Sequence, residues 1–172
     1  MTFSRLAAAA LIAVSGATFA LAAGPTDPQI AHIAYTAGVI DIEAAKLALQ
    51  KSQNAEVIAF ANSMVSDHEA VNEQALALVG KLGVTPEDND TSKSLVAAAE
   101  AKRAELTALE GADFDKAYAA NEVAYHQTVN GALESTLIPS ASNAELKDLL
   151  TTGLRLFQGH QQHAEQLAAS LQ

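Results

Sequence analysis

The sequence predicts an all-α protein, an antiparallel bundle of four long helices arranged as two hairpins. Beyond residue 23 the chain is rich in alanine and has few internal glycines or prolines that would interrupt a helix. In four long segments apolar residues recur at three- and four-residue steps, which is the spacing of one helix face. Alternating β-branched residues, which would indicate strands, are scarce.

The first 22 residues have the features of a signal peptide. Arg5 supplies a positive start, residues 6–14 form a short apolar run, and the Ala-Leu-Ala triplet at residues 20–22 provides small residues before a cleavage site. The apolar run is shorter than the roughly 20 residues that a membrane-spanning helix needs. We therefore expect export to the periplasm or cell envelope. Residues 23–172 should form a single domain without a membrane span.

Two long helices are expected in the first half of the domain. Asp27 is a candidate cap of the first helix, with Pro28 at the first helical position, and this helix should extend to about Lys51. Asn54 is a cap for the second helix, which should extend to about Leu82 before Gly83. Because the break between them is so short, the two helices should form an antiparallel hairpin.

The second half should contain a shorter helix and a second hairpin. The shorter helix is expected over residues 92–109, lying across the bundle. A third long helix is expected from Asp113 to about Thr136 and a fourth over residues 144–170, with Pro139 in the turn between them. Two hairpins joined by a longer crossover are the connectivity of ferritin-like bundles. The expected fold is therefore a ferritin-like antiparallel four-helix bundle with an extra short helix in the crossover.

Composition argues against several classes of function. The chain carries 20 acidic and 10 basic residues, a formal net charge of -10. This balance argues against a nucleic-acid partner and against adhesion to anionic membranes. The sequence has no cysteine, so neither a disulfide nor a lipid-bearing N-terminal cysteine can form. It also lacks a nucleophile elbow, a phosphate-cradling loop and a dinucleotide fingerprint.

Histidines stand on or beside the apolar faces of three of the expected long helices. His68 continues the apolar series of the second helix, and His126 and His160 fall on similar faces of the third and fourth. Imidazole and carboxylate groups together suit zinc, copper, iron or nickel. Glu122 shares a helix face with His126, His163 lies on the same side of its helix as His160, and the first helix offers Asp41. The candidate metal ligands are therefore His68, His126, His160, Glu122, Asp41 and His163.

Helix geometry limits how many of these candidates can meet. Asp41 and Glu43 point about 200° apart, so at most one of them faces the bundle axis. With the turn centred near Pro139, His126 and His160 would be offset by about 10 Å along the axis. The sequence therefore leaves open whether the candidates form one site. The alternative is that the histidines are hydrogen-bonded core residues, with His68 held by Asp67 or by a facing carboxylate.

Several segments resemble a large bacterial family of exported proteins, the domain of unknown function number 4142, whose members are often described as membrane or outer-membrane proteins. The matching segments lie throughout the chain beyond the signal peptide: residues 40–48, 57–61, 64–68, 114–118, 123–126 and 160–164. The resemblance implies a ferritin-like four-helix bundle. It also implies characteristic positions at Asp67, His68, His126, His160 and Asp41, where the family usually has glutamate.

The resemblance does not extend to the di-iron ferritin-like proteins, which carry Glu-x-x-His on two helices. Here Val65 stands three residues before His68, and Phe157 stands three residues before His160. The resemblance to the family therefore does not imply ferroxidase activity for this chain.

These observations favour an exported bundle of unassigned role that binds a transition metal through core histidines, for storage, sensing or buffering. One alternative is an interaction or stress module of the cell envelope with structural histidines, whose partner is an envelope protein or a second copy of the chain. The other is a metal-dependent oxidoreductase, against which the missing Glu-x-x-His pattern counts. The sequence favours a binding protein over an enzyme.

Overall fold

The computed structural model describes residues 24–172, and this part of the chain forms helices and no strand. Five helices are long, and a π-helical segment and a short helix follow the fourth: α1 (Asp27–Lys51), α2 (Ala55–Leu82), α3 (Asp90–Thr107), α4 (Gly111–Ala132), η1 (Leu133–Leu137), α5 (Ile138–Ser140) and α6 (Ala144–Ser170). The all-α prediction is confirmed. The predicted signal peptide, residues 1–22, lies outside the described residues.

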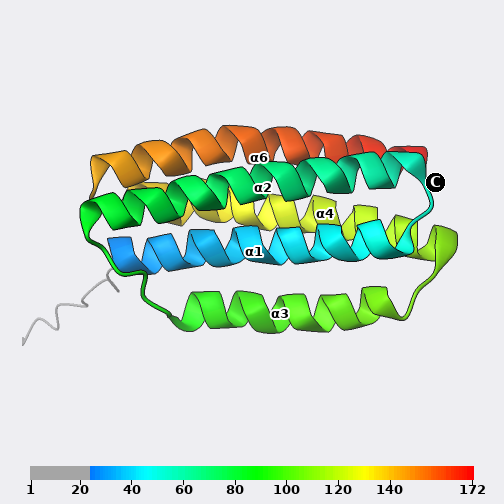
Figure 1. The fold of residues 1–172 in the computed structure, drawn as a ribbon, viewed down its shortest axis with the longest axis horizontal. Coiled ribbons are helices and arrows are strands. Elements are labelled where there is room, and N and C mark those ends of the chain that lie inside the picture. Colours follow the sequence, from blue (N-terminus) through cyan, green and yellow to red (C-terminus); the bar gives the residue numbers. More distant parts are fainter. Residues whose placement is uncertain (1–23) are drawn as a thin grey trace, which may run out of the picture.

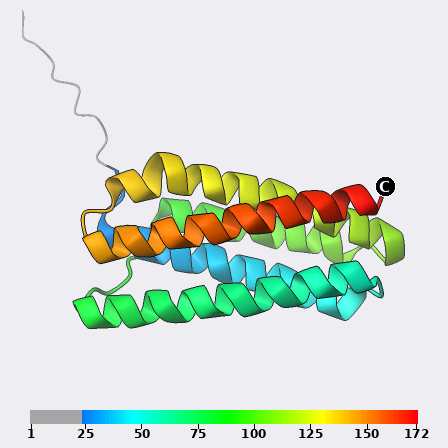
Figure 2. The same ribbon diagram turned by 90° about the horizontal axis from the view of Figure 1, so that it is seen from above.

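Four of the helices, α1, α2, α4 and α6, lie side by side along the long axis of the molecule (Figure 1). α1 packs against α2 and α4 packs against α6, and further contacts join α2 to α6 and α1 to α4. Seen from above, α6 lies between α4 and α2 (Figure 2). None of the helices in residues 24–172 combines the length and the apolar character needed to cross a membrane.

α3 runs lengthwise along α1 instead of lying across the bundle as expected (Figure 1). The end of α2 and the start of α4 lie at opposite ends of the molecule, so the connection between them must cover its length. An 18-residue helix covers about 27 Å of that distance. The direction of α3 therefore follows from the two points that it joins.

Local capping signals explain most helix starts, with one revision. Asn54 accepts hydrogen bonds from the backbone N–H groups of Glu56 and Val57, as expected for a cap of α2. α1 is capped by Thr26 and not by Asp27. The carboxylate of Asp27 instead accepts hydrogen bonds from Ser142 and from the backbone N–H of Asn143. Asp27 thereby ties the start of α1 to the turn before α6.

α4 begins earlier and its helical backbone continues further than the sequence predicted. It starts at Gly111, with Asp113 inside the first turn, where a carboxylate favours the positive end of the helix dipole. Beyond Ala132 the helical backbone continues through η1 and α5 to Ser140. Pro139 has no N–H group and cannot donate to the carbonyl one turn earlier. The helix widens just before it, because the N–H of Ile138 bonds to the carbonyl of Leu133, five residues back.

Two groups of buried apolar residues divide the core. We call the first the aromatic end; its largest members are Phe60, Met64, Phe114 and Tyr118. We call the second the aliphatic end; its members include Ile30, Ile33, Leu133, Leu146 and Leu150. In each of α1, α2, α4 and α6, buried polar residues separate the contributions to the two ends. They are Asp41, His68, Glu122, His126 and His160. A buried polar layer thus lies between two apolar clusters.

Candidate metal centre

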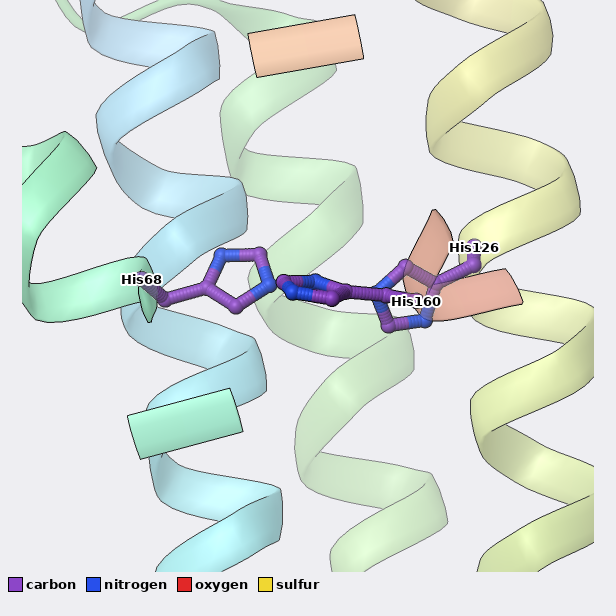
Figure 3. A group of neighbouring side chains, drawn as sticks. All are labelled: His68, His126 and His160. Atoms are coloured by element: carbon purple, nitrogen blue, oxygen red, sulfur yellow. The ribbon is translucent and has the colours of Figure 1, made fainter. Parts of the chain in front are cut away.

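The structure brings together three histidines from three helices. The rings of His68 in α2, His126 in α4 and His160 in α6 point toward one another (Figure 3). Their centroids are 5.3 Å apart for His68 and His160, 5.6 Å for His126 and His160, and 5.9 Å for His68 and His126. One ring nitrogen of each lies within 4.8 Å of the others. All three are buried. This spacing is short enough for the nitrogens to share one cation.

The offset expected between His126 and His160 is therefore wrong, for a reason that lies in the backbone after α4. Because helical structure continues to Ser140, the turn is centred on Ser142 and not near Pro139. Counting outward from Ser142 places His126 opposite Gln158, about 3 Å along the axis from His160. The two histidines consequently lie in the same layer.

Two carboxyl groups complete the polar layer. The Oδ2 atom of Asp41 in α1 lies 3.5 Å from Nε2 of His68 and 3.4 Å from Nε2 of His126. Glu122 lies one turn before His126 in α4, with Oε2 3.8 Å from Nδ1 of that ring. Asp41, Glu122 and His126 form a second group of ligand atoms within 4.8 Å of one another. The shorter side chain of aspartate at position 41 therefore still reaches the histidines.

Two other polar residues that the sequence analysis considered lie away from this layer. His163 is exposed, and its ring packs edge-on against Phe60 with a centroid distance of 5.0 Å. Glu43 points outward from α1 and pairs with Arg103 of α3. Of the six candidate ligands, the structure brings together five and leaves His163 outside the cluster.

Two of the three rings are fixed by hydrogen bonds that leave one nitrogen facing the cluster. Nδ1 of His126 lies 2.9 Å from the carbonyl oxygen of Glu122, so it carries the proton and leaves Nε2 as the acceptor. Nε2 of His160 lies 2.9 Å from Oδ2 of Asp67, so its proton-free nitrogen is Nδ1. A carboxylate behind a histidine is the arrangement that commonly orients metal ligands.

The role of Asp67 differs from the one that the sequence suggested. Asp67 precedes His68 by one residue, which places it about 100° around α2, toward α6. It therefore holds His160 and not its own neighbour. The ring of His68 is positioned instead by Phe157, which stacks on it with a centroid distance of 4.7 Å and an interplanar angle of 7°.

Burial sets the protonation states in the layer. Burial raises the pKa of Asp41 to about 7, and burial together with the charge of Asp41 raises the pKa of Glu122 well above its usual value. Burial lowers the pKa of His68 to about 3 and that of His126 to about 4. The pKa of His160 is lowered by burial, although Asp67 opposes the shift. The imidazoles are thus neutral at pH 7, which is the form that binds metals.

The layer also holds an unusual number of buried polar atoms without a hydrogen-bond partner among residues 24–172. They are both carboxyl oxygens of Asp41, both ring nitrogens of His68, Nε2 of His126, Nδ1 of His160 and Oε2 of Glu122. Each unsatisfied buried group costs about 1–3 kcal/mol. These atoms come from four helices, and the candidate ligand atoms form two groups that share His126. The donor set suits a cation, which would supply the missing partner to one nitrogen of each histidine and to a carboxyl oxygen of Asp41.

A cavity of about 600 Å³ lies beside this layer, and the sequence analysis did not anticipate it. Asp41, His68 and His126 line one part, and the remaining lining is mostly apolar, with contributions from Ile33 and Leu150 of the aliphatic end. Small residues occur repeatedly among the lining positions: Ala31, Ala34, Ala37, Gly38, Ala75 and Gly153. This series of small residues is the sequence signal that could have indicated the cavity.

Comparisons with known proteins support the helical fold and identify the family of the chain. A solved structure described as "CopM in the Cu(II)-bound form" has a similar fold, with a TM-score of 0.65 and 14% sequence identity over 87% of this chain and 99% of that chain. At this identity the likeness concerns the fold alone. No curated protein matches the chain. The model of the family described as "Domain of unknown function (DUF4142)" matches residues 13–167. The chain therefore belongs to this family, as the resemblance of its sequence segments indicated.

Proposed function

We propose that this protein is an exported, ferritin-like four-helix bundle that binds one divalent transition-metal ion inside its polar layer. His68, His126, His160 and Asp41 would be the ligands. The observation that carries the proposal is the set of buried, unpartnered nitrogen and oxygen atoms, among the described residues, that converge from α1, α2, α4 and α6. A cation would convert this costly arrangement into a stabilising one.

The hydrogen bonds and distances within the layer indicate which atoms would bind the ion. Nε2 of His126 and Nδ1 of His160 are the nitrogens left available by the hydrogen bonds on the other side of each ring. Nε2 of His68 is its nitrogen nearest to Asp41. If Asp41 and Glu122 ionise when the ion binds, their two charges balance those of a divalent cation.

Three imidazoles and a carboxylate suit zinc, copper, nickel or iron. Among the divalent ions, copper(II) binds such sites most tightly by the Irving–Williams order. A solved structure of similar fold is described as Cu(II)-bound. We therefore place copper first and zinc second among the ions to be tested.

We propose binding, and not turnover, as the role of the site. The features of a signal peptide in the first 22 residues favour action in the periplasm or cell envelope. There the site would buffer or store the metal. The missing Glu-x-x-His pattern argues against a di-iron oxidase.

A metal titration tests the proposal. Protein expressed from the full chain is purified without a chelator or a polyhistidine tag, treated with EDTA, and titrated with copper(II) or zinc(II). We expect one high-affinity ion per chain. The free energy of unfolding should rise by about 2.7 kcal/mol at a free metal concentration 100 times the Kd.

A matched pair of histidine variants locates the ion. His68→Ala should weaken binding at least about 100-fold, because it removes a ligand from the first coordination sphere. His163→Ala removes an exposed histidine on α6 and should leave the affinity within about twofold. If the unmodified protein binds no metal, or if His68→Ala binds it equally well, the histidines are structural core residues and the proposal is wrong.

A further inference from the structure

We infer that the cavity beside the polar layer binds an apolar carboxylate, such as a straight-chain acid of the length of decanoate, with its head group on the bound metal ion. This inference rests on the proposed metal site and names a second ligand for it. The hydrocarbon chain would occupy the apolar part of the cavity, and the carboxylate would add a fifth ligand on the side of the ion that faces the cavity, next to the three histidines and Asp41.

The size and lining of the cavity suit a small organic molecule. Ligand sites usually enclose about 300–1,000 Å³ and have mostly apolar walls with a few polar groups, and this cavity of about 600 Å³ has both properties. Along α1 its lining runs from Gln29 to Asp41, which corresponds to about 18 Å. The cavity is therefore long enough for an extended acyl chain.

The space is produced by the choice of side chains. α1 contributes Ala31, Ala34 and Ala37 to the lining, and α2 contributes Ala75. In the aromatic end, by contrast, α2 and α4 contribute the large, fully buried side chains of Phe60 and Phe114. A core usually packs to the density of an organic crystal, so a run of small residues facing one space indicates a site for something else.

The polar part of the cavity is made by part of the metal centre. Asp41, His68 and His126 line the cavity, whereas His160 and Glu122 are not among its lining residues. A metal ion held by the three histidines would therefore be approached from the side of the cavity. A cation favours an anionic oxygen donor on that side over an alcohol or a hydrocarbon.

A second polar group is available for the same head group. Asn72 lies four residues after His68 on the same face of α2, is buried, and lines the cavity. Its closeness to α1 depends on Gly38, because a Cβ atom at that position would lie 2.4 Å from Oδ1 of Asn72. The side-chain amide would donate to the carboxylate oxygen that the metal does not hold.

Binding of acids of increasing chain length to the unmodified protein tests this inference. The zinc-loaded full chain is titrated with acetate, hexanoate, decanoate and decanol, and the same titrations are made on the metal-free protein. The affinity should rise by up to about fourfold for each methylene that becomes buried. Decanoate should bind at least about tenfold more tightly to the zinc-loaded protein than to the metal-free protein, and more tightly than decanol.

Filling the cavity provides a second test. Ala34→Leu combined with Ala75→Leu places larger side chains in the lining, away from the metal ligands. We expect decanoate to bind at least tenfold more weakly, while zinc affinity, acetate affinity and helix content stay unchanged. The control, Ala77→Leu, makes one such enlargement at an exposed position of α2 and should bind decanoate like the unmodified protein.

The possible outcomes separate this inference from the proposed function. Zinc binding without tighter binding of the longer acids overturns the inference alone and leaves the cavity as an entry route for the ion. Equal affinities for decanoate and decanol overturn the assignment of the head group. Failure of the protein to bind zinc overturns both proposals. If the double variant does not fold, the chain-length series on the unmodified protein decides the matter.

Discussion

The aromatic end and the aliphatic end of the core lie in the same helical bundle but are filled differently. In the aromatic end, the rings of Phe60 and Phe114 lie 6.2 Å and 6.1 Å from the ring of Tyr118, and all three side chains are fully buried. In the aliphatic end, small residues leave the cavity of about 600 Å³. The aromatic end therefore contributes stability through dense packing, whereas the aliphatic end is packed less densely and leaves space.

The polar layer lies at the boundary between these two ends. Burying its five polar residues costs desolvation free energy, whereas burying the apolar residues of the two clusters does not. The buried rings of the aromatic end lie on one side of the layer, and the cavity on the other side gives access to the histidines. Such a division is typical of functional sites, where a rigid scaffold supports groups that would be unfavourable elsewhere.

The largest expected effect is on stability at the aromatic end. Phe60→Ala should lower the free energy of unfolding by about 3–5 kcal/mol, because it removes a fully buried ring and leaves a void. Urea denaturation of the metal-free protein measures this change. The fraction that remains folded should bind metal normally. A loss below about 1 kcal/mol would mean that this end of the core is not tightly packed.

The next effect concerns the pH dependence of metal binding at the boundary. Because burial raises the pKa of Asp41 to about 7, its carboxyl is neutral below that pH, and an incoming ion must displace the proton. Metal affinity should therefore fall at least about tenfold for each pH unit below 7, since at least this proton must be displaced. His68 and His126, with pKa values of about 3 and 4, stay mostly neutral down to about pH 5 and add little slope above it.

The variant Asp41→Asn provides the control for this pH dependence. It has no proton to release, so its affinity should be lower at pH 8 and should vary less between pH 5 and 7. Titrations with zinc in buffers that do not bind the metal measure both proteins. An unmodified protein with the same affinity at pH 5 and pH 8 would show that Asp41 is not a ligand.

A smaller effect is expected from the residue behind His160. Asp67→Asn keeps the shape of the side chain but removes the charge that orients the ring, and should weaken metal binding about 10- to 100-fold. Glu69→Gln, two residues further along α2, removes an exposed charge that pairs with Lys46 and should have no comparable effect. Equal affinities for the two variants would remove Asp67 from the metal centre.

The smallest expected effect is a difference in stability loss between two valine-to-alanine substitutions, one in the aromatic end and one beside the cavity. Val57→Ala lies in the aromatic end, and Val79→Ala lies on the same helix but lines the cavity. Val57→Ala should cost about 2 kcal/mol of stability, and Val79→Ala about 1 kcal/mol, because the side chain of Val79 already faces open space. Equal losses in denaturation experiments would contradict the difference in packing between the two ends.

The helices could be predicted from the sequence because their signals are local. Asn54 caps α2 through its own side chain, and Gly83 ends it with a φ of 63°. Neither feature depends on distant parts of the chain. The apolar spacing likewise indicated that His68 faces the core, because helix periodicity is independent of what the helix packs against.

The arrangement of the candidate site could be predicted only in part, because it depends on how helices meet. The shared layer of His126 and His160 follows from helical backbone that continues through η1 to Ser140, whereas Pro139 in the sequence indicated an earlier turn. Asp67 contacts His160 because α6 lies on that side of α2. The cavity reflects the combined size of side chains on several helices, which no single segment reveals.

The most direct test of the account counts the imidazoles on the ion. Pulsed electron paramagnetic resonance of the copper(II)-loaded protein, with nitrogen-15 in its histidines, reports how many imidazole rings coordinate the metal. We expect three rings in the unmodified protein and two in His126→Ala. One ring or none in the unmodified protein, or an unchanged number in the variant, would contradict a metal centre built from α2, α4 and α6.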